Sequence, residues 1–260
     1  MANRIPQKNA FDVAARYHTW LTRFALYACF FSITSTVLSF FAFYSYFENF
    51  VAVISVIALL VISFLQVRFR STYRDAEKIR RDSLIDSSFG TKIAEVEAEG
   101  YYANTDINTG FRKLLSAIHE SSSLSLEIIE AMARKQEAFT LIGCAVVIIA
   151  CAASSLQSTL FLAILNGFLS LNMISDYLEL RYLRTEIRTV CDNCKHICED
   201  HCSTHRNSLT TVQQAHVIRE CLRYENALAY ASLMFSDKEY AKLNPSHEKK
   251  WDEVKKRYYG

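Results

Sequence analysis

The sequence predicts an all-α membrane protein with four transmembrane helices in two hairpins and cytoplasmic helical extensions. Two long stretches are apolar: residues 24–67 contain one charged side chain, Glu48, and residues 138–175 contain none. A helix needs about 20 apolar residues to cross a bilayer core about 30 Å thick, so each stretch can hold one pair of spans. The chain of 260 residues has only 6 Gly and 2 Pro, which argues against a loop-rich β-sandwich or a long disordered tail. Together these observations exclude an ordinary water-soluble enzyme.

Each apolar stretch has one polar interruption near its middle. Residues 44–49 combine aromatic side chains with the single glutamate, and residues 154–158 form the only polar cluster of the second stretch. These interruptions predict four spans, at about residues 24–46, 50–67, 138–153 and 159–175. Because the second pair of spans is short, one re-entrant hairpin is the alternative there.

Basic residues indicate which ends of the spans face the cytoplasm. Arg and Lys precede the first and third spans and follow the second and fourth, whereas neither short hairpin loop contains one. Cytoplasmic flanks carry this excess of basic residues, so both termini are expected in the cytoplasm. The chain then divides into an N-terminal cytoplasmic segment with the first hairpin (1–67), a cytoplasmic helical linker (68–137), the second hairpin (138–175) and the C-terminal cytoplasmic helices (176–260).

The cytoplasmic segments are expected to be helical, because no Pro interrupts residues 7–244 and good helix formers are abundant. The helix of the second span is expected to continue to about Ser87 and to end near Phe89-Gly90, and residues 100–110 are expected to be a turn-rich hinge. Further helices are predicted from Phe111 into the third span, at 177–205, at 209–235, and from Asn244-Pro245 to Tyr259, with Pro at the first helical position.

Four basic side chains share one face of the helix after the second span: Arg70, Arg74, Lys78 and Arg81. We call them the basic row. Guanidinium and ammonium groups in a row suit the phosphates of a nucleotide or nucleic-acid ligand, so the row is the predicted ligand-binding site. The alternative is a basic membrane flank that reaches lipid headgroups. That alternative suits Arg70 better than Arg81, which lies about 20 Å beyond the end of the span.

A later helix carries Cys191, Cys194, Cys198 and Cys202, interleaved with His196, His201 and His205. Cys and His are preferred zinc ligands, but on one helix the outer two cysteines lie about 16 Å apart along the axis, too far to share a metal. The cysteines also continue an apolar stripe from Ile187 to Leu209, which favours packing against another helix. We therefore predict no metal site on this helix. A metal shared between helices or subunits and redox sensing stay open as alternatives, and a helix break near Cys194 would favour the metal.

Polar and small residues inside the predicted spans can either line a pore or pack helices together. Thr159, Ala163, Asn166 and Ser170 share one face of the fourth span and are the candidate pore-lining residues, with helix packing as the alternative. Small residues on the first span, beginning with Ala25 and Ala28, are typical of close helix packing. No span buries an acidic or basic side chain, which argues against a proton-coupled pump or a voltage sensor.

Sequence signatures of enzymes are absent. The chain contains no GxSxG, Walker loop, HExxH or GxGxxG. His119-Glu120, next to three serines, is best explained by a polar helix surface. We therefore expect no enzymatic activity and no cofactor.

Several short motifs occur together between about residues 10 and 190: Ala15-Arg16-Tyr17, Tyr73-Arg74-Asp75-Ala76-Glu77-Lys78, Ser88-Phe89-Gly90, Gly100-Tyr101-Tyr102-Ala103-Asn104 and the second hairpin. With these motifs the chain resembles bacterial antiviral membrane effectors encoded beside second-messenger nucleotidyltransferases, of the four-transmembrane class or the related two-transmembrane class. It is also similar to the channel subunit of a Hailong-type two-gene defence system. The resemblance implies a homo-oligomeric pore, taken as a tetramer, in the bacterial inner membrane. It further implies control by a nucleotide or short oligonucleotide made by a co-encoded nucleotidyltransferase.

These expectations combine into one functional prediction. The chain is expected to be an oligomeric ion channel or pore-forming effector of anti-phage defence, embedded in the lipid bilayer and gated by a ligand on its cytoplasmic helices. Two alternatives belong to other classes: a membrane-anchored metal or redox sensor that uses the Cys/His-rich helix, and a passive membrane scaffold for a soluble partner.

Overall fold

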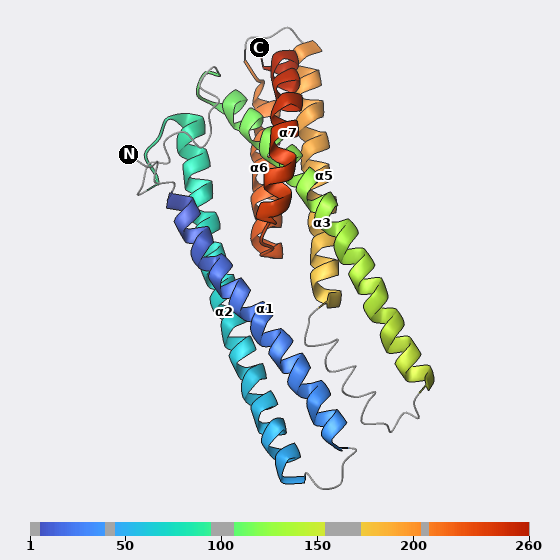
Figure 1. Ribbon diagram of the computed structural model, residues 1–260. Helices are drawn as coiled ribbons and strands as arrows, with labels where there is room; N and C mark the ends of the chain where they lie inside the picture. The colour runs from blue at the N-terminus through green and yellow to red at the C-terminus, as the bar shows by residue number, and fades with distance from the viewer. Residues whose placement is uncertain (1–5, 40–44, 95–106, 154–172, 204–207, 260) are drawn as a thin grey trace. The chain divides into compact units, whose positions relative to one another are not determined.

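The computed structural model describes residues 6–39, 45–94, 107–153, 173–203 and 208–259 (Figure 1). These residues are 91% helical, contain no strand and form six helices, which confirms the predicted all-α class. The helices are α1 (Pro6–Ser39), α2 (Ser45–Phe89), α3 (Phe111–Ala153), α5 (Met173–Ser203), α6 (Thr211–Ala231) and α7 (Asp237–Tyr258).

The chain forms two compact units, each assembled from segments far apart in the sequence. Unit 1 contains Met1–Phe11, Tyr73–Ala133 and Glu179–Gly260, and unit 2 contains Asp12–Thr72 and Arg134–Leu178. Most of the two predicted hairpins belongs to unit 2, whereas most of the predicted linker and C-terminal segment belongs to unit 1. The long helices α2 and α3 contribute residues to both units.

Unit 1 is a helical bundle with one apolar core. The end of α2, the start of α3, and helices α5, α6 and α7 each turn an apolar face with helical spacing toward this core. On α3, for example, Leu114, Leu115 and Ile118 are buried, as the apolar pattern of the sequence predicts. Fully buried core residues from the other helices include Leu84, Leu183, Ile187, Val190, Cys194 and Val217.

In unit 2, α1 packs on α2 through small side chains. Ala25 and Ala28 of α1 are buried in one cluster with Ala58 and Ile62 of α2. This contact confirms that the small residues at the start of the first predicted span allow close helix packing. Figure 1 shows the two helices side by side.

The outward surface of unit 2 is strongly apolar. Large apolar side chains that are more than half exposed include Leu26, Phe30, Val53, Leu60, Phe64, Val67, Phe139, Leu141, Ile148 and Ile149. Water-soluble proteins rarely expose apolar patches of this extent. A lipid environment is the setting in which such a surface is stable.

One helical segment, Val53–Phe89, is long and apolar enough to cross a membrane, by length and composition. Only 11% of its apolar window is buried, whereas a core helix of a soluble protein is mostly buried. Within the described residues no other helix meets the same criterion. The structure therefore supports association with a membrane. Residues 154–172, which include most of the fourth predicted span, lie outside the described part of the chain.

The predicted break between α2 and α3 is confirmed at both ends. Helix α2 ends at Phe89, and Gly90 follows with a φ of +69°, a left-handed conformation that glycine adopts without strain. The Gly90 N–H donates to the Asp86 carbonyl (2.8 Å), which closes the last turn. Helix α3 begins at Phe111, as expected. Of the predicted hinge at 100–110, only residues 107–110 are described.

The predicted turn of the first hairpin is wrong. Residues 45–49, which were expected to end the first span and form the turn, are the first residues of α2. Residues 40–44, between α1 and α2, lie outside the described part of the chain. Ser45 and Glu48 are three residues apart, as in the capping-box pattern typical of helix starts, so the sequence of this segment is also compatible with a helix N-terminus.

The predicted start of the last helix is also wrong. Helix α7 begins at Asp237, and Pro245 lies inside it. The Ser236 side chain accepts a hydrogen bond from the Glu239 N–H (3.4 Å) and so caps the N-terminus, and acidic Asp237 and Glu239 lie in the first turn. These local contacts start the helix upstream of the proline.

The other two C-terminal helices occur near their predicted places. Helix α5 begins at Met173, four residues before the expected start, and continues to Ser203. Helix α6 follows a capping box made by Thr210 and Gln213. It ends at Ala231 rather than near residue 235, because Ser232 takes a left-handed conformation with a φ of 46°.

Candidate functional site

The basic row lies on one continuous helix, α2, as its spacing requires. Arg70, Arg74 and Lys78 are exposed and Arg81 is partly buried. Arg70 belongs to unit 2 and the other three belong to unit 1. The row is thus a surface feature of α2, beside a stripe of buried residues on the same helix.

Arg80, next to the row in the sequence, has a different environment. Its side chain is buried: Nε donates to Glu77 Oε2 (2.8 Å) and one terminal nitrogen donates to Glu225 Oε2 (2.6 Å). Its guanidinium also lies 5.5 Å from the ring centroid of Tyr224. Sequence reasoning missed this role, because Arg80 resembles one more residue of a basic membrane flank.

Two tyrosines complete this buried polar cluster. Tyr73 Oη donates to the Leu233 carbonyl (3.1 Å), and Tyr224 Oη lies 3.0 Å from Ser125 Oγ. Burial raises the pKa of the Glu225 carboxyl, and the positive charge of Arg80 opposes that shift. The cluster therefore joins α2, α3 and α6 inside unit 1. Because it is buried, we interpret it as stabilising the packing of these helices rather than as binding a ligand.

The cysteine-rich helix α5 is continuous and shows no break near Cys194. Cys194 and Cys198 are buried in the core of unit 1, Cys191 is partly buried and Cys202 is exposed. Burial raises the pKa of the Cys198 thiol to about 12 and also raises the pKa of the Cys194 thiol well above its ordinary value, so both thiols stay protonated. The packing interpretation fits the two buried cysteines and does not fit Cys202.

A metal site is not formed by the part of the chain that the structure describes. Within those residues, no three His, Cys, Asp or Glu side chains lie close enough together to hold a metal ion. His205, one of the interleaved histidines, lies outside that part. So do the candidate pore-lining residues Thr159, Ala163, Asn166 and Ser170, whose role stays a prediction.

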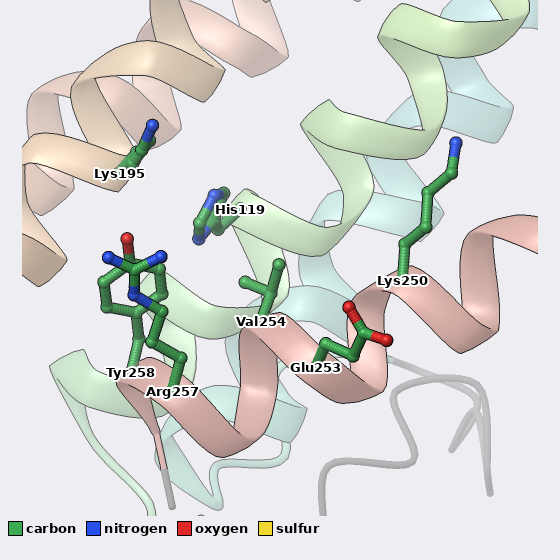
Figure 2. Close-up of a pocket in the computed structure, with 7 residues that line it drawn as sticks. All are labelled: His119, Lys195, Lys250, Glu253, Val254, Arg257 and Tyr258. Atoms are coloured by element: carbon green, nitrogen blue, oxygen red, sulfur yellow. The ribbon is translucent and has the colours of Figure 1, made fainter.

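A cavity of about 450 Å³ opens on unit 1 between α3, α5 and α7 (Figure 2). We call it the His119 cavity. Its lining residues are His119 from α3, Lys195 from α5, and Lys250, Glu253, Val254, Arg257 and Tyr258 from α7. The five α7 residues recur at helical spacing and therefore share one face of that helix. None of the residues of the basic row lines the cavity.

His119 lies at the buried side of the cavity. Its ring packs edge-to-face on Trp251 (5.2 Å between centroids), and its Nδ1 lies 3.2 Å from Tyr259 Oη. Burial, with a smaller contribution from the charge of Lys195, lowers the pKa of His119 to about 4, so the ring is neutral at pH 7. The expectation that His119 belongs to a polar helix surface is wrong, since the side chain is only 5% exposed.

The open side of the cavity carries the charges. Lys250 Nζ donates to Glu127 Oε1 (2.7 Å), and Lys195 Nζ lies 3.9 Å from Glu199 Oε1. The Arg257 guanidinium lies 5.1 Å from the ring centroid of Tyr258. Figure 2 shows His119 between Lys195 and Val254, with Arg257 and Tyr258 together on one side.

The sequence held a signal for part of this cavity. Lys250, Glu253, Val254 and Arg257 already have the spacing of one helix face. Their meeting with His119 and Lys195 could not be read from the chain, because it depends on how three distant helices pack. The lining has three cations and one carboxylate around a partly apolar hollow; because Lys250 is paired with Glu127, Lys195 and Arg257 are the cations that can meet an anion. Comparisons with models of protein families, with curated proteins and with solved structures found no match.

Proposed function

We propose that this chain forms a homo-oligomeric membrane pore whose cytoplasmic helices sense a nucleotide or short oligonucleotide. One observation carries the proposal: α2 is a single helix that contains exposed large apolar residues between Phe50 and Val67 and continues into the basic row. A stiff helix shared by both units provides a direct route from a bound ligand to the membrane segment. Helix α3, which also contributes to both units, provides a second route.

The proposed topology has four spans in two hairpins, in a bacterial inner membrane, with both termini in the cytoplasm. Support comes from the distribution of basic residues, from the segment Val53–Phe89 and from the exposed apolar surface of unit 2. In this topology Thr159, Ala163, Asn166 and Ser170 line the pore.

The proposed biological role is defence against phage, in keeping with the family resemblance. A co-encoded nucleotidyltransferase supplies the ligand, and the pore then dissipates ion gradients. The ligand can shift the gate only by the difference between its affinities for the open and closed states. The change in ion flux on ligand binding therefore depends on residues of the basic row that contact the ligand in only one of these two states.

The metal-sensor or redox-sensor alternative has less support than the pore. Cys194 and Cys198, the central pair of the cysteine helix, are buried protonated thiols and thus poor metal ligands and poor nucleophiles.

The proposal is tested by ion flux from proteoliposomes that contain the full-length protein, with AMP or short oligoadenylates added as probes. We expect a flux that responds to a probe, and the double variant Arg74→Ala/Lys78→Ala should lose that response while its oligomer size stays the same. The control is Lys242→Ala/Lys249→Ala, which removes two exposed lysines outside both the row and the His119 cavity. Proteoliposomes without flux under every condition would reject the pore and favour the scaffold alternative.

A further inference from the structure

We propose that the His119 cavity binds a small phosphorylated molecule of the mononucleotide class. The anionic character of the ligand follows from the cavity itself, whereas the choice of a nucleotide rests on the proposed function. The site differs from the basic row in its geometry, because it is a hollow with a buried floor rather than an exposed helix face.

The cations of the cavity come from two helices, and Figure 2 shows Lys195 and Arg257 on the side of His119, with Lys250 farther along α7. Lys195 projects from α5, and Lys250 and Arg257 project from α7 two turns apart. Glu253 is the single carboxylate among the lining residues. Among the described residues Arg257 has no carboxylate within ion-pair distance, and its guanidinium lies over the Tyr258 ring, so its planar fork can donate two hydrogen bonds to a phosphate.

Each of the two lysines lies beside a carboxylate outside the cavity lining. Glu127 accepts from Lys250, and Glu199 lies close to Lys195 while also accepting from Tyr258 Oη (3.1 Å). Neither glutamate lines the cavity. Lys250 is neutralised by Glu127, so a phosphate that enters meets Lys195 and Arg257.

The floor of the cavity supplies a neutral hydrogen-bond donor. Burial raises the pKa of both Cys198 and Tyr259, so both keep their protons. Cys198 Sγ lies 3.0 Å from Tyr259 Oη, and a chain in which the thiol donates to Tyr259 and Tyr259 donates to His119 Nδ1 satisfies all three groups. This chain places the proton of the neutral imidazole on Nε2, the nitrogen left to donate to a ligand.

The size and lining of the cavity suit a ligand with an apolar part. A volume of about 450 Å³ lies within the range of small-molecule sites, roughly 300–1,000 Å³. Val254, Tyr258 and the His119 ring offer apolar and aromatic contacts beside the cations. A base can pack on these groups while its phosphate meets Lys195 and Arg257.

The test is equilibrium binding to the full-length protein in detergent, with AMP, adenosine and inorganic phosphate as probes. We expect AMP to bind best, because adenosine lacks the charge and phosphate lacks the apolar part. Lys195→Gln and Arg257→Gln should each weaken AMP binding about tenfold, and Glu253→Gln should strengthen it. The matched control is Lys249→Gln, an exposed lysine on α7 outside the cavity, which should leave AMP binding unchanged.

Absence of AMP binding to the wild type would overturn the proposal. An equal loss of AMP affinity in Lys249→Gln and Lys195→Gln would also overturn it, because it would indicate that surface charge alone attracts AMP. The flux assay separates this proposal from the proposed function. If the cavity variants weaken AMP binding but the protein conducts no ions, the site stands and the pore is rejected. A pore whose response to AMP is unchanged in Lys195→Gln/Arg257→Gln keeps the function and rejects the site.

Discussion

At the scale of single residues, burial decides what a charged side chain does. Arg80 and the four residues of the basic row have similar sequence surroundings, yet Arg80 alone is enclosed by Glu77 and Glu225. A buried ion pair that loses one partner leaves the other charge desolvated, which is much more costly than the loss of an exposed pair.

Arg80→Ala should therefore destabilise unit 1 by about 3–5 kcal/mol, because Glu225 would stay buried without its partner. Thermal unfolding of the detergent-solubilised protein measures the effect. Asp75→Ala, an exposed residue on the same helix, is the control and should change stability by about 0.5 kcal/mol or less. Equal unfolding temperatures for the two variants would contradict the buried cluster.

His119 predicts how stability depends on pH. Its folded pKa of about 4 lies below the ordinary value of 6.5, so the folded state favours the neutral ring. The contribution of neutral His119 to the free energy of unfolding is complete above pH 6.5 and is lost as the pH falls toward 4, because the unfolded chain takes up the proton first. The difference between the folded and unfolded pKa corresponds to about 3 kcal/mol. Burial also lowers the pKa of His247, which adds to the loss in the same direction.

The measurement is the unfolding temperature between pH 7.5 and pH 4.5 for the wild type, for His119→Gln and for His196→Gln. His119→Gln should have a flatter pH profile than the wild type, because it removes the buried group that must take up a proton. His196, an exposed histidine on α5 beside Glu199, is the control and should change the profile less than His119→Gln does. Parallel profiles for all three proteins would refute the assignment.

At the scale of elements, the end of α2 depends on one backbone conformation. Gly90 has a φ of +69°, and a Cβ added there would meet Thr109 Cγ2 at 3.8 Å, an ordinary contact. The cost of a side chain at this position is therefore conformational rather than steric. Gly110, which precedes α3, donates its N–H to the Ser88 carbonyl (2.7 Å) and ties the two helix ends together.

Gly90→Ala should lower the stability of unit 1 by about 1–2 kcal/mol, because alanine is strained in the left-handed region. Gly90→Asn should cost less, since asparagine tolerates this conformation. Thermal unfolding of both variants beside the wild type checks the order. An alanine variant as stable as the asparagine variant would show that this conformation does not limit stability.

At the scale of the whole molecule, the contrast between the two units is one of surface chemistry. Unit 1 encloses its apolar side chains in one core, whereas unit 2 exposes many of its largest ones. A charged side chain placed in the middle of a membrane helix costs about 2.5–3.5 kcal/mol for insertion, but the same change on a water-exposed helix costs little.

Leu60→Arg should accordingly lower the yield of protein in the membrane fraction, whereas Leu222→Arg should not. Both leucines are at least half exposed, the first on α2 in unit 2 and the second on α6 in unit 1. The measurement is the share of full-length protein that resists carbonate extraction and enters detergent. Equal shares for the two variants, or a wild type that stays soluble without detergent, would refute a membrane location of α2.

Patterns local in the sequence predicted much of the fold. The all-α class, the end of α2 at Phe89, the start of α3 at Phe111 and the approximate extents of α5 and α6 all follow from apolar spacing and from glycine. The starts of α2 and α7 were missed: the turn expected at residues 44–49 is helical from Ser45, and the helix expected from Pro245 begins at Asp237. At α7 the cap at Ser236 outweighed Pro245.

The amino-acid sequence by itself determined the helical class, the charge distribution that predicts the topology, and the apolar stretches that suit a membrane. Only the tertiary structure decided that Arg80 is buried, that Cys194 belongs to a core and that His119 borders a cavity with Lys195 and Arg257. Helix formation depends on neighbours three and four residues away, which the sequence displays directly. Burial and cavities depend on which distant helices meet, and that is set by the packing of the whole unit.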